Sequence, residues 1–315
     1  MNILIEGAGA IGIALGASMI SQNANVSFYA SQRTADKLTE GIKRIGIFNH
    51  LSFSQDSYEV YTDYNDLPED SFDFVFVCSK TIANEDISNN LNEHRNILKK
   101  GAKIIIFQNG FGNDEPYLRY FDKDEVFCAR VITGFSRPER NISEITVHTE
   151  PILLGSLQGA DIEVLKPIAE MISSSGIPSE INENLDKFLW AKMLYNCALN
   201  PLGAILGVNY GKLTENDYSI AIMNKIIEEI FNVIKAAGYS TNWDKPEEYQ
   251  DIFYSKLVPD TYNHFSSTYQ DISKKQKTEI DSLNGMVIKL GEKYDVDVSV
   301  NKTIYHLIKS IEADF

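Results

Sequence analysis

Apolar runs and helical patterns alternate along the first half of the chain. The mainly apolar residues 1–6 lead into a glycine-rich turn and then into a helical pattern. Further apolar runs at Val26–Tyr29, Phe72–Cys78 and Lys103–Phe107 are each followed by polar residues, as expected of buried parallel strands. This alternation predicts a doubly wound parallel sheet, which binds ligands at the carboxyl ends of its strands.

Toward the middle of the chain, short predicted strands give way to long predicted helices. Val126–Ile132 and Ile145–Val147 are predicted as strands of a hairpin-rich ending, and Ile152–Leu154 as the strand that closes the sheet. Beyond Gly176-Ile-Pro178, long helical periods take over. The character of the chain therefore changes near residues 179–184.

Two domains follow from this change and from the length of the chain. A chain of 315 residues exceeds the size at which a single core usually stops growing. We expect an α/β Rossmann-type N-terminal domain over 1–182 and an all-α C-terminal domain over 183–315, with helices over Ser219–Gly238 and Glu279–Tyr294.

Charge and cysteine content narrow the class of protein. A formal net charge of −15 argues against nucleic acid and anionic membranes as partners. Cys78, Cys128 and Cys197 are widely spaced and form no CxxC pair, so we expect buried thiols in a reducing compartment. The first strand begins at Met1, which leaves no room for a signal peptide, and no apolar run reaches the length of a membrane span. These features predict a cytoplasmic protein.

A dinucleotide-binding motif joins the first strand to the first helix. The motif is the run Gly7, Ala8, Gly9, Ala10, Ile11 and Gly12. Gly7 permits a tight turn, Gly9 lets the backbone approach a pyrophosphate, and Gly12 lets the helix pack on the strand. The helix N-terminus then directs backbone N–H groups at phosphate. The alternative is a glycine-rich turn that serves packing alone; the strand and helix around it favour a nicotinamide or flavin cofactor.

The residues after the second strand indicate which nicotinamide cofactor is used. Proteins that bind NAD usually place an Asp or Glu there to hold the ribose 2′-hydroxyl. Residues 28–34 contain no carboxylate, whereas Ser31 and Arg33 are available to a 2′-phosphate. We therefore expect NADP(H), with a solvated loop arginine as the alternative interpretation of Arg33.

A polar row occurs on an otherwise apolar helix over residues 186–202. Lys192, Asn196 and Asn200 are spaced at four-residue intervals and therefore share one drifting face. One ammonium and two amides suit a polar ligand. Alternatively, Lys192 is a snorkelling surface lysine and the asparagines are caps or interhelical hydrogen-bonding groups.

Six segments, taken in chain order, resemble the motifs of one known family. They are the glycine motif, Val77-Cys-Ser-Lys80, Phe107-Gln-Asn109-Gly-Phe-Gly112, Trp190-x-Lys192-x-x-x-Asn196-x-x-x-Asn200-Pro201, Ser266-Ser267-x-x-Gln270-Asp271 and Thr278-Glu279-Ile-Asp-Ser-Leu-Asn284-Gly285. Together they resemble the ketopantoate reductase (2-dehydropantoate 2-reductase) family, and the resemblance spans essentially the whole chain. It implies NADPH-dependent reduction of ketopantoate to pantoate, a step of pantothenate and coenzyme A biosynthesis.

The resemblance implies a role for each polar residue of the C-terminal half. Lys192 is similar to the family's general acid, and Asn196 and Asn200 to its substrate contacts. Ser267 is similar to the group that meets the substrate carboxylate, and Glu279 to the group that binds the substrate's hydroxyl end. A helix cap or a solvated hydroxyl is the alternative for Ser267, and a first-turn helix carboxylate is the alternative for Glu279.

The N-terminal half contains further family positions and two departures. Lys80 and Asn109 resemble residues that line the cofactor, and Asn109 also the substrate, at the edge of the sheet. Ser31 stands where the family often has an arginine, with Arg33 two residues later. Glu6 is a charge at the end of a strand that usually ends on an apolar residue.

The chemistry of a ketone reductase agrees with these roles. Hydride transfer to a ketone builds negative charge on its oxygen, which a lysine can stabilise and then protonate. We expect a small 2-oxo acid as substrate and no bound metal. If the protein forms an oligomer, we expect a homodimer that pairs through the helical domain. Two alternatives stay open for this protein. It is a member of the same family that reduces another 2-oxo acid or carbonyl compound, or it is a non-catalytic NADP-binding redox sensor.

Overall fold

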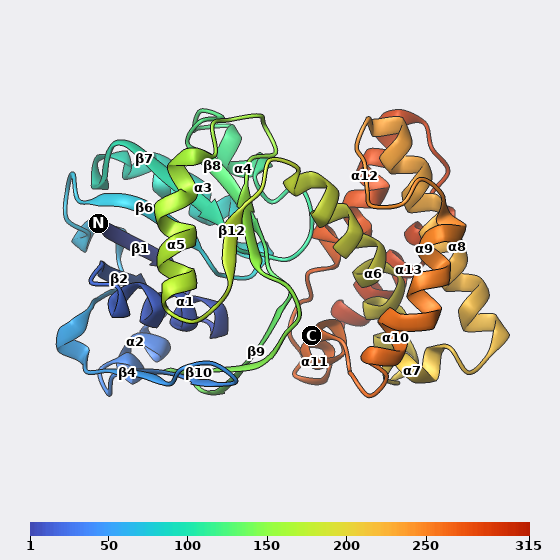
Figure 1. Ribbon diagram of the computed structural model, residues 1–315, viewed down its shortest axis with the longest axis horizontal. Coiled ribbons are helices and arrows are strands. Elements are labelled where there is room, and N and C mark those ends of the chain that lie inside the picture. Colours follow the sequence, from blue (N-terminus) through green and yellow to red (C-terminus); the bar gives the residue numbers. More distant parts are fainter. The chain divides into compact units, whose positions relative to one another are not determined.

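The computed structural model describes all 315 residues, which divide into two compact units (Figure 1). Unit 1 comprises Met1–Gln108 and Asn113–Leu185. Unit 2 comprises the four residues Asn109–Gly112 together with Asp186–Phe315. A short segment of the N-terminal half thus belongs, by its contacts, with the helical part of the chain.

Unit 1 is built on an eight-stranded sheet with the strand order β12-β11-β8-β7-β6-β1-β2-β5. All neighbouring strands are parallel except β8 and β11, which pair antiparallel. The central strands are the apolar runs of the sequence, and their side chains form the core. The strands are β1 (Asn2–Glu6), β2 (Asn25–Tyr29), β5 (Glu59–Tyr61), β6 (Phe72–Val77), β7 (Leu98–Ile106), β8 (Val126–Arg130), β11 (Ile152–Gly155) and β12 (Ser179–Ile181).

A second sheet of four strands corrects the predicted ending of the N-terminal domain. The expected strand Ile145–Val147 belongs to this sheet and not to the main one, because β10 pairs in parallel with β3. Ile152–Leu154 does not close the main sheet either, since β12 pairs with its outer edge. The strand order is β4 (Leu51–Phe53), β3 (Ile42–Gly46), β10 (Ile142–His148) and β9 (Thr133–Glu139).

Helices connect and cover the main sheet of unit 1. Helix α1 packs closely because two of its residues are glycines: a Cβ at Gly12 would lie 2.1 Å from the Gly7 carbonyl oxygen, and one at Gly16 would lie 2.3 Å from the Phe28 ring. Helices α1 and α5 contact each other (Figure 1). The helices are α1 (Ala10–Ser21), α2 (Gln32–Leu38), α3 (Asn84–Glu93), α4 (Glu115–Leu118) and α5 (Lys166–Ser174). The prediction of a Rossmann-type α/β domain is confirmed.

Unit 2 is helical, as predicted. The expected helix Ser219–Gly238 is α8, which ends where Gly238 takes a left-handed conformation with φ 76°. The expected helix Glu279–Tyr294 is wrong at its start, since a 3₁₀ turn, η7 (Ile280–Ser282), precedes α12. The helices are α6 (Leu185–Leu206), α7 (Tyr210–Leu213), α8 (Asp217–Ala237), α9 (Pro246–Ile252), α10 (Val258–Asp260), α11 (Ser267–Ser273), α12 (Asn284–Tyr294) and α13 (Ser299–Glu312). No helix is both long and apolar enough to cross a membrane.

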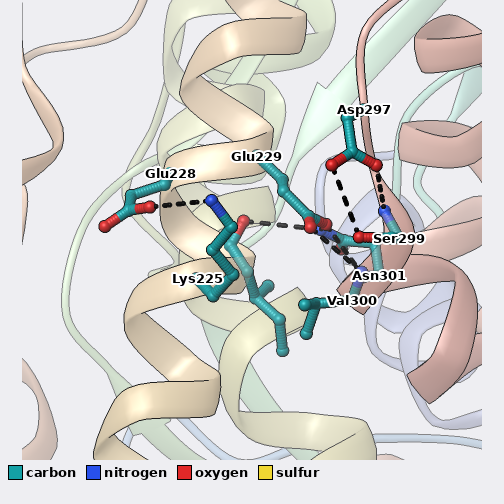
Figure 2. Close-up of polar contacts among 8 residues, drawn as sticks. Lys225, Glu228, Glu229, Asp297, Ser299, Val300 and Asn301 are labelled. Carbon is teal, nitrogen blue, oxygen red and sulfur yellow. Dashed lines mark hydrogen bonds and ion pairs between the residues drawn. The ribbon is translucent and has the colours of Figure 1, made fainter.

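A buried carboxylate joins α8 to the start of α13 (Figure 2). Glu229, 1% exposed, accepts hydrogen bonds from the backbone N–H of Val300 (3.0 Å) and of Asn301 (2.9 Å), and from the Asn301 side-chain amide (2.8 Å). The Asn301 amide oxygen in turn accepts from Asn284 Nδ2 at 2.9 Å. Because a helix N-terminus carries unpaired N–H groups and partial positive charge, Glu229 stabilises α13 and, through Asn284, fixes the start of α12.

Candidate active site

The glycine turn after β1 has room for a ligand at one position. Gly7 has φ +100°, and a Cβ there would lie 2.6 Å from the Ser79 backbone nitrogen. Gly7 and Gly12 are therefore required by the protein's own packing. A Cβ at Gly9 would meet only the Cys78 carbonyl oxygen, at 3.8 Å. Gly9 also precedes α1, whose first turn carries no acidic residue. The space at Gly9 and the N-terminus of α1 together fit a cofactor pyrophosphate.

The end of β2 presents hydroxyl and guanidinium groups to solvent. Ser31 precedes α2 and, instead of capping its backbone, donates a hydrogen bond to Thr34 Oγ1 at 3.4 Å. Arg33 is exposed and forms no ion pair. Both predicted 2′-phosphate residues are thus accessible at the carboxyl edge of the sheet.

Glu6, unexplained by the sequence, is a buried carboxyl at the end of β1. Its side chain is 1% exposed, and Tyr64 Oη donates a hydrogen bond to Glu6 Oε1 at 2.5 Å. Burial raises the pKa of Glu6 to about 8, although the Tyr64 hydrogen bond opposes this rise. Glu6 is therefore held largely as a neutral carboxyl directly before the glycine turn. Tyr64 was not identified from the sequence.

Three side chains in unit 2 form a hydrogen-bonded row. Lys192 Nζ, on α6, donates to Asn109 Oδ1 at 2.5 Å. Asn109 Nδ2 donates to Glu279 Oε2 at 3.2 Å. The structure thus brings together an ammonium, an amide and a carboxylate that are far apart in the sequence. All three side chains are half-buried.

The segment Asn109–Gly112 is fixed in unit 2 by an aromatic cluster. The Phe111 ring centroid lies 4.7 Å from that of Trp190 and 5.1 Å from that of Tyr239. The Phe111 N–H donates to the Ser282 carbonyl oxygen at 3.0 Å, and Ser282 Oγ donates to the Asn109 carbonyl oxygen at 3.3 Å. These contacts hold Asn109 in place between α6 and η7. Ser282 was missed because nothing in its local sequence marks it.

The turn that carries Glu279 is held by the C-terminal helix. Glu312, 6% exposed, accepts hydrogen bonds from the backbone N–H and the hydroxyl of Thr278 at 2.7 and 2.6 Å. Asp281 accepts from Tyr305 Oη at 2.7 Å and pairs with Lys309 at 3.1 Å. Glu279 lies between these two contacts and directly before η7. It is therefore not the first-turn carboxylate of an α-helix, which was the alternative interpretation.

The two asparagines of α6 differ in their surroundings. Asn196 is half-buried, and its side-chain amide forms no hydrogen bond with the protein. Asn200 is 5% exposed, and its amide oxygen accepts a hydrogen bond from Tyr210 Oη at 2.6 Å. Burial raises the pKa of Tyr210, which keeps its phenol protonated as a donor. Asn200 could therefore meet a ligand only through its amide nitrogen.

Ser267 and Lys80 lie at the starts of short helical segments. Ser266, not Ser267, caps α11, since Ser266 Oγ accepts from the Tyr269 N–H at 3.0 Å. The cap interpretation of Ser267 is thus wrong, and its hydroxyl is exposed. Lys80 is half-buried and follows β6, directly before the 3₁₀ turn Thr81–Ala83.

The three cysteines are free, and Cys128 and Cys197 are buried. Burial raises the pKa of all three thiols. A thiol must ionise to act as a nucleophile, so none of them is suited to covalent catalysis.

Comparison with known proteins supports one family over the whole chain. The family model described as ketopantoate reductase PanE/ApbA matches residues 3–159, and the model of its C-terminal part matches residues 184–312. The 2-dehydropantoate 2-reductase of Aquifex aeolicus (strain VF5) is 33% identical over 99% of this chain and 97% of that protein. The 2-dehydropantoate 2-reductase of Archaeoglobus fulgidus is 26% identical over 99% of this chain and 98% of that protein.

Solved structures show the same fold. A PanE/ApbA family ketopantoate reductase from Ralstonia eutropha JMP134 has a TM-score of 0.84 at 24% identity, covering 100% of this chain and 99% of that one. A D-mandelate dehydrogenase solved with NADH and anilino(oxo)acetate has a TM-score of 0.85 at 20% identity with the same coverage. The chain therefore belongs to the ketopantoate reductase family, a family of NAD(P)H-dependent oxidoreductases that act on CH–OH groups.

Proposed function

We propose that the protein reduces 2-dehydropantoate to pantoate with NADPH. The observation that carries the proposal is the row of Lys192, Asn109 and Glu279, which offers a proton donor beside an acceptor for a substrate hydroxyl. The full-length match to curated 2-dehydropantoate 2-reductases supports this substrate, which is a 2-oxo acid with a hydroxyl group.

The two parts of the chain would divide the work. Residues 1–182 would bind NADP(H) and residues 183–315 would bind substrate and carry the general acid. The backbone N–H groups of residues 8–12 would hold the pyrophosphate, Ser31 and Arg33 the 2′-phosphate, and Lys80 and Asn109 would line the cofactor. When bound, the nicotinamide supplies a hydride to C2 of the substrate.

Lys192 would act as the general acid. Its ammonium already donates to a neutral amide oxygen, Asn109 Oδ1, so a substrate carbonyl oxygen could take the same kind of hydrogen bond. As hydride arrives, that ammonium would stabilise the developing alkoxide and then transfer a proton to it. Asn109 is oriented from both sides, since its oxygen faces Lys192 and its nitrogen faces Glu279.

The remaining polar groups would hold the two ends of the substrate. Glu279 would accept a hydrogen bond from the substrate's hydroxyl. Asn196, Asn200 and Ser267 would donate to its carboxylate, and such neutral donors bind an anion without burying an unpaired charge.

Replacement of Lys192 by alanine tests the chemical step. Loss of a general acid should lower turnover by about 10²- to 10⁴-fold. The dissociation constant of NADPH should barely change, as measured by isothermal titration calorimetry. Lys235→Ala removes an exposed lysine from α8 and serves as the control. A folded Lys192→Ala protein with near-normal turnover would refute the assignment.

The second candidate function is the reduction of a different 2-oxo acid. The structural likeness to D-mandelate dehydrogenase favours it. A panel of 2-oxo acids, followed by NADPH and NADH absorbance, separates the two. We also infer a cytoplasmic location from the three free thiols.

A further inference from the structure

The turn between β9 and β10 contacts α2 in unit 1. Arg140, in the turn of this hairpin, donates a hydrogen bond from Nη1 to Thr34 Oγ1 at 3.3 Å. Thr34 is 5% exposed and lies in the first turn of α2, one residue after Arg33. A residue more than a hundred positions away thus reaches the segment where the cofactor ribose is expected.

The same hairpin is attached to the glycine turn. Arg137 Nη2 donates to the Ala8 carbonyl oxygen at 2.6 Å and to the Arg140 carbonyl oxygen at 2.6 Å. Arg137 is half-buried, and burial together with the charge of Arg140 lowers its pKa. Because Arg137 binds the main chain of Arg140, it fixes the hairpin turn independently of the Arg140 side chain.

An open hollow of about 440 Å³ lies between α2 and the hairpin turn. Its acidic groups are already engaged: Lys37 pairs with Glu40 at 2.6 Å and with Glu139 at 3.5 Å, and Asp36 accepts from Gln32 at 2.7 Å. The residues that line it are Arg33, Asp36, Lys37, Glu40, Glu139 and Arg140. Neither arginine forms an ion pair with the acidic residues that line the hollow.

We propose that Arg140 and Arg33 together bind the 2′-phosphate of the cofactor. The inference rests on the proposed use of NADPH and adds to it a specificity residue from the second sheet. Two guanidinium groups offer several N–H donors in planar geometry to phosphate oxygens. A ribose 2′-hydroxyl is instead usually held by a carboxylate after the second strand, and residues 28–34 contain none. Ser31 stands where the family often has an arginine, and Arg140 thereby supplies the second positive charge at this site.

Direct binding of adenosine fragments tests this site without catalysis. Isothermal titration calorimetry of the full chain with adenosine 2′,5′-bisphosphate and with 5′-AMP isolates the 2′-phosphate. Arg140→Ala should weaken the bisphosphate roughly 10- to 100-fold and change 5′-AMP by less than about twofold. Arg140→Lys keeps the charge but not the planar fork, and should recover only part of this loss.

Two further variants control for general charge effects and for folding. Lys43→Ala removes an exposed cation from β3 in the same second sheet, and should leave the selectivity between the two ligands unchanged. Arg140→Gln keeps a donor for Thr34 and should lose the bisphosphate preference even if the alanine variant is unstable.

The outcomes separate this inference from the proposed function. If folded Arg140 variants bind the bisphosphate as tightly as wild type, or lose both ligands equally, the inference is wrong while NADPH preference stands. If the wild-type protein itself binds both ligands equally, the choice of NADPH is wrong and the inference falls with it. The turnover test on Lys192 is independent of either result.

Discussion

Replacing the buried Glu6 by glutamine should remove a pH dependence from the stability of unit 1. Glu6 is 1% exposed, and its hydrogen bond from Tyr64 can be made equally well to an amide oxygen. Glutamine has nearly the same shape as a neutral carboxyl but cannot ionise. The substitution therefore tests whether the carboxyl is held neutral in the folded state.

The size of the effect follows from the pKa of Glu6, which burial raises from 4.5 to about 8. A group whose pKa is raised on folding contributes its full stability below the unfolded value, because both states are then protonated. As pH rises above the unfolded pKa, the unfolded state releases this proton first, and the stability contributed by Glu6 falls progressively. The fall ends near pH 8, where the folded carboxyl also ionises. The slope is about 1.4 kcal/mol per pH unit, which amounts to roughly 5 kcal/mol over the interval.

Urea denaturation at several pH values between about 5 and 8 measures this change. Both tryptophans, Trp190 and Trp243, lie in unit 2, so their fluorescence does not follow unit 1. Far-ultraviolet circular dichroism, with hydrogen exchange of peptides from β1, reports on unit 1 instead. We expect Glu6→Gln to gain stability over wild type progressively as pH rises.

The control is Glu170→Gln, which alters an exposed carboxylate on α5. Its stability curve should run parallel to that of wild type. If the Glu6→Gln curve also runs parallel to wild type across this pH range, Glu6 does not remain neutral in the folded protein and the reasoning is refuted.

Two other substitutions test unit 2. Glu279→Ala should raise KM and lower kcat far more for a hydroxylated 2-oxo acid than for one without the hydroxyl, and equal losses in steady-state kinetics would indicate a structural role. Glu229→Ala leaves the N–H groups of Val300 and Asn301 without their acceptor, and should lower the free energy of unfolding by about 2 to 4 kcal/mol in urea titrations followed by tryptophan fluorescence. Glu228→Gln, on the exposed side of the same helix, should change it by less than about 0.5 kcal/mol.

Features that depend on neighbouring residues could be predicted from the sequence. Strand β1, the glycine turn and α1 follow one another without interruption, so local apolar periodicity and the backbone freedom of Gly7 were enough to identify them. Helix α8 likewise has its own apolar face and its own terminating glycine, Gly238. Lys192, Asn196 and Asn200 could be placed on one helix because their spacing alone determines their common side.

The start of α12 shows where local periodicity fails. The helical pattern predicted a start at Glu279, but Thr278 is bound by Glu312 from α13, and the chain forms a 3₁₀ turn before the helix begins. Asn284 then starts α12 against Asn301. A partner 34 residues away thus decides the conformation of the residue proposed to bind substrate.

Pairings between distant segments were decided only by the tertiary structure. Asn109 follows a strand of unit 1 yet meets Lys192 and Glu279 in unit 2. Arg140 reaches Thr34 because β10 pairs with β3 across about a hundred residues. A cluster of arginines around this hairpin, in a chain of net charge −15, was the one signal that could have drawn attention to it. Residue patterns record which face of an element is buried, whereas the identity of its partner depends on how all the buried faces pack together.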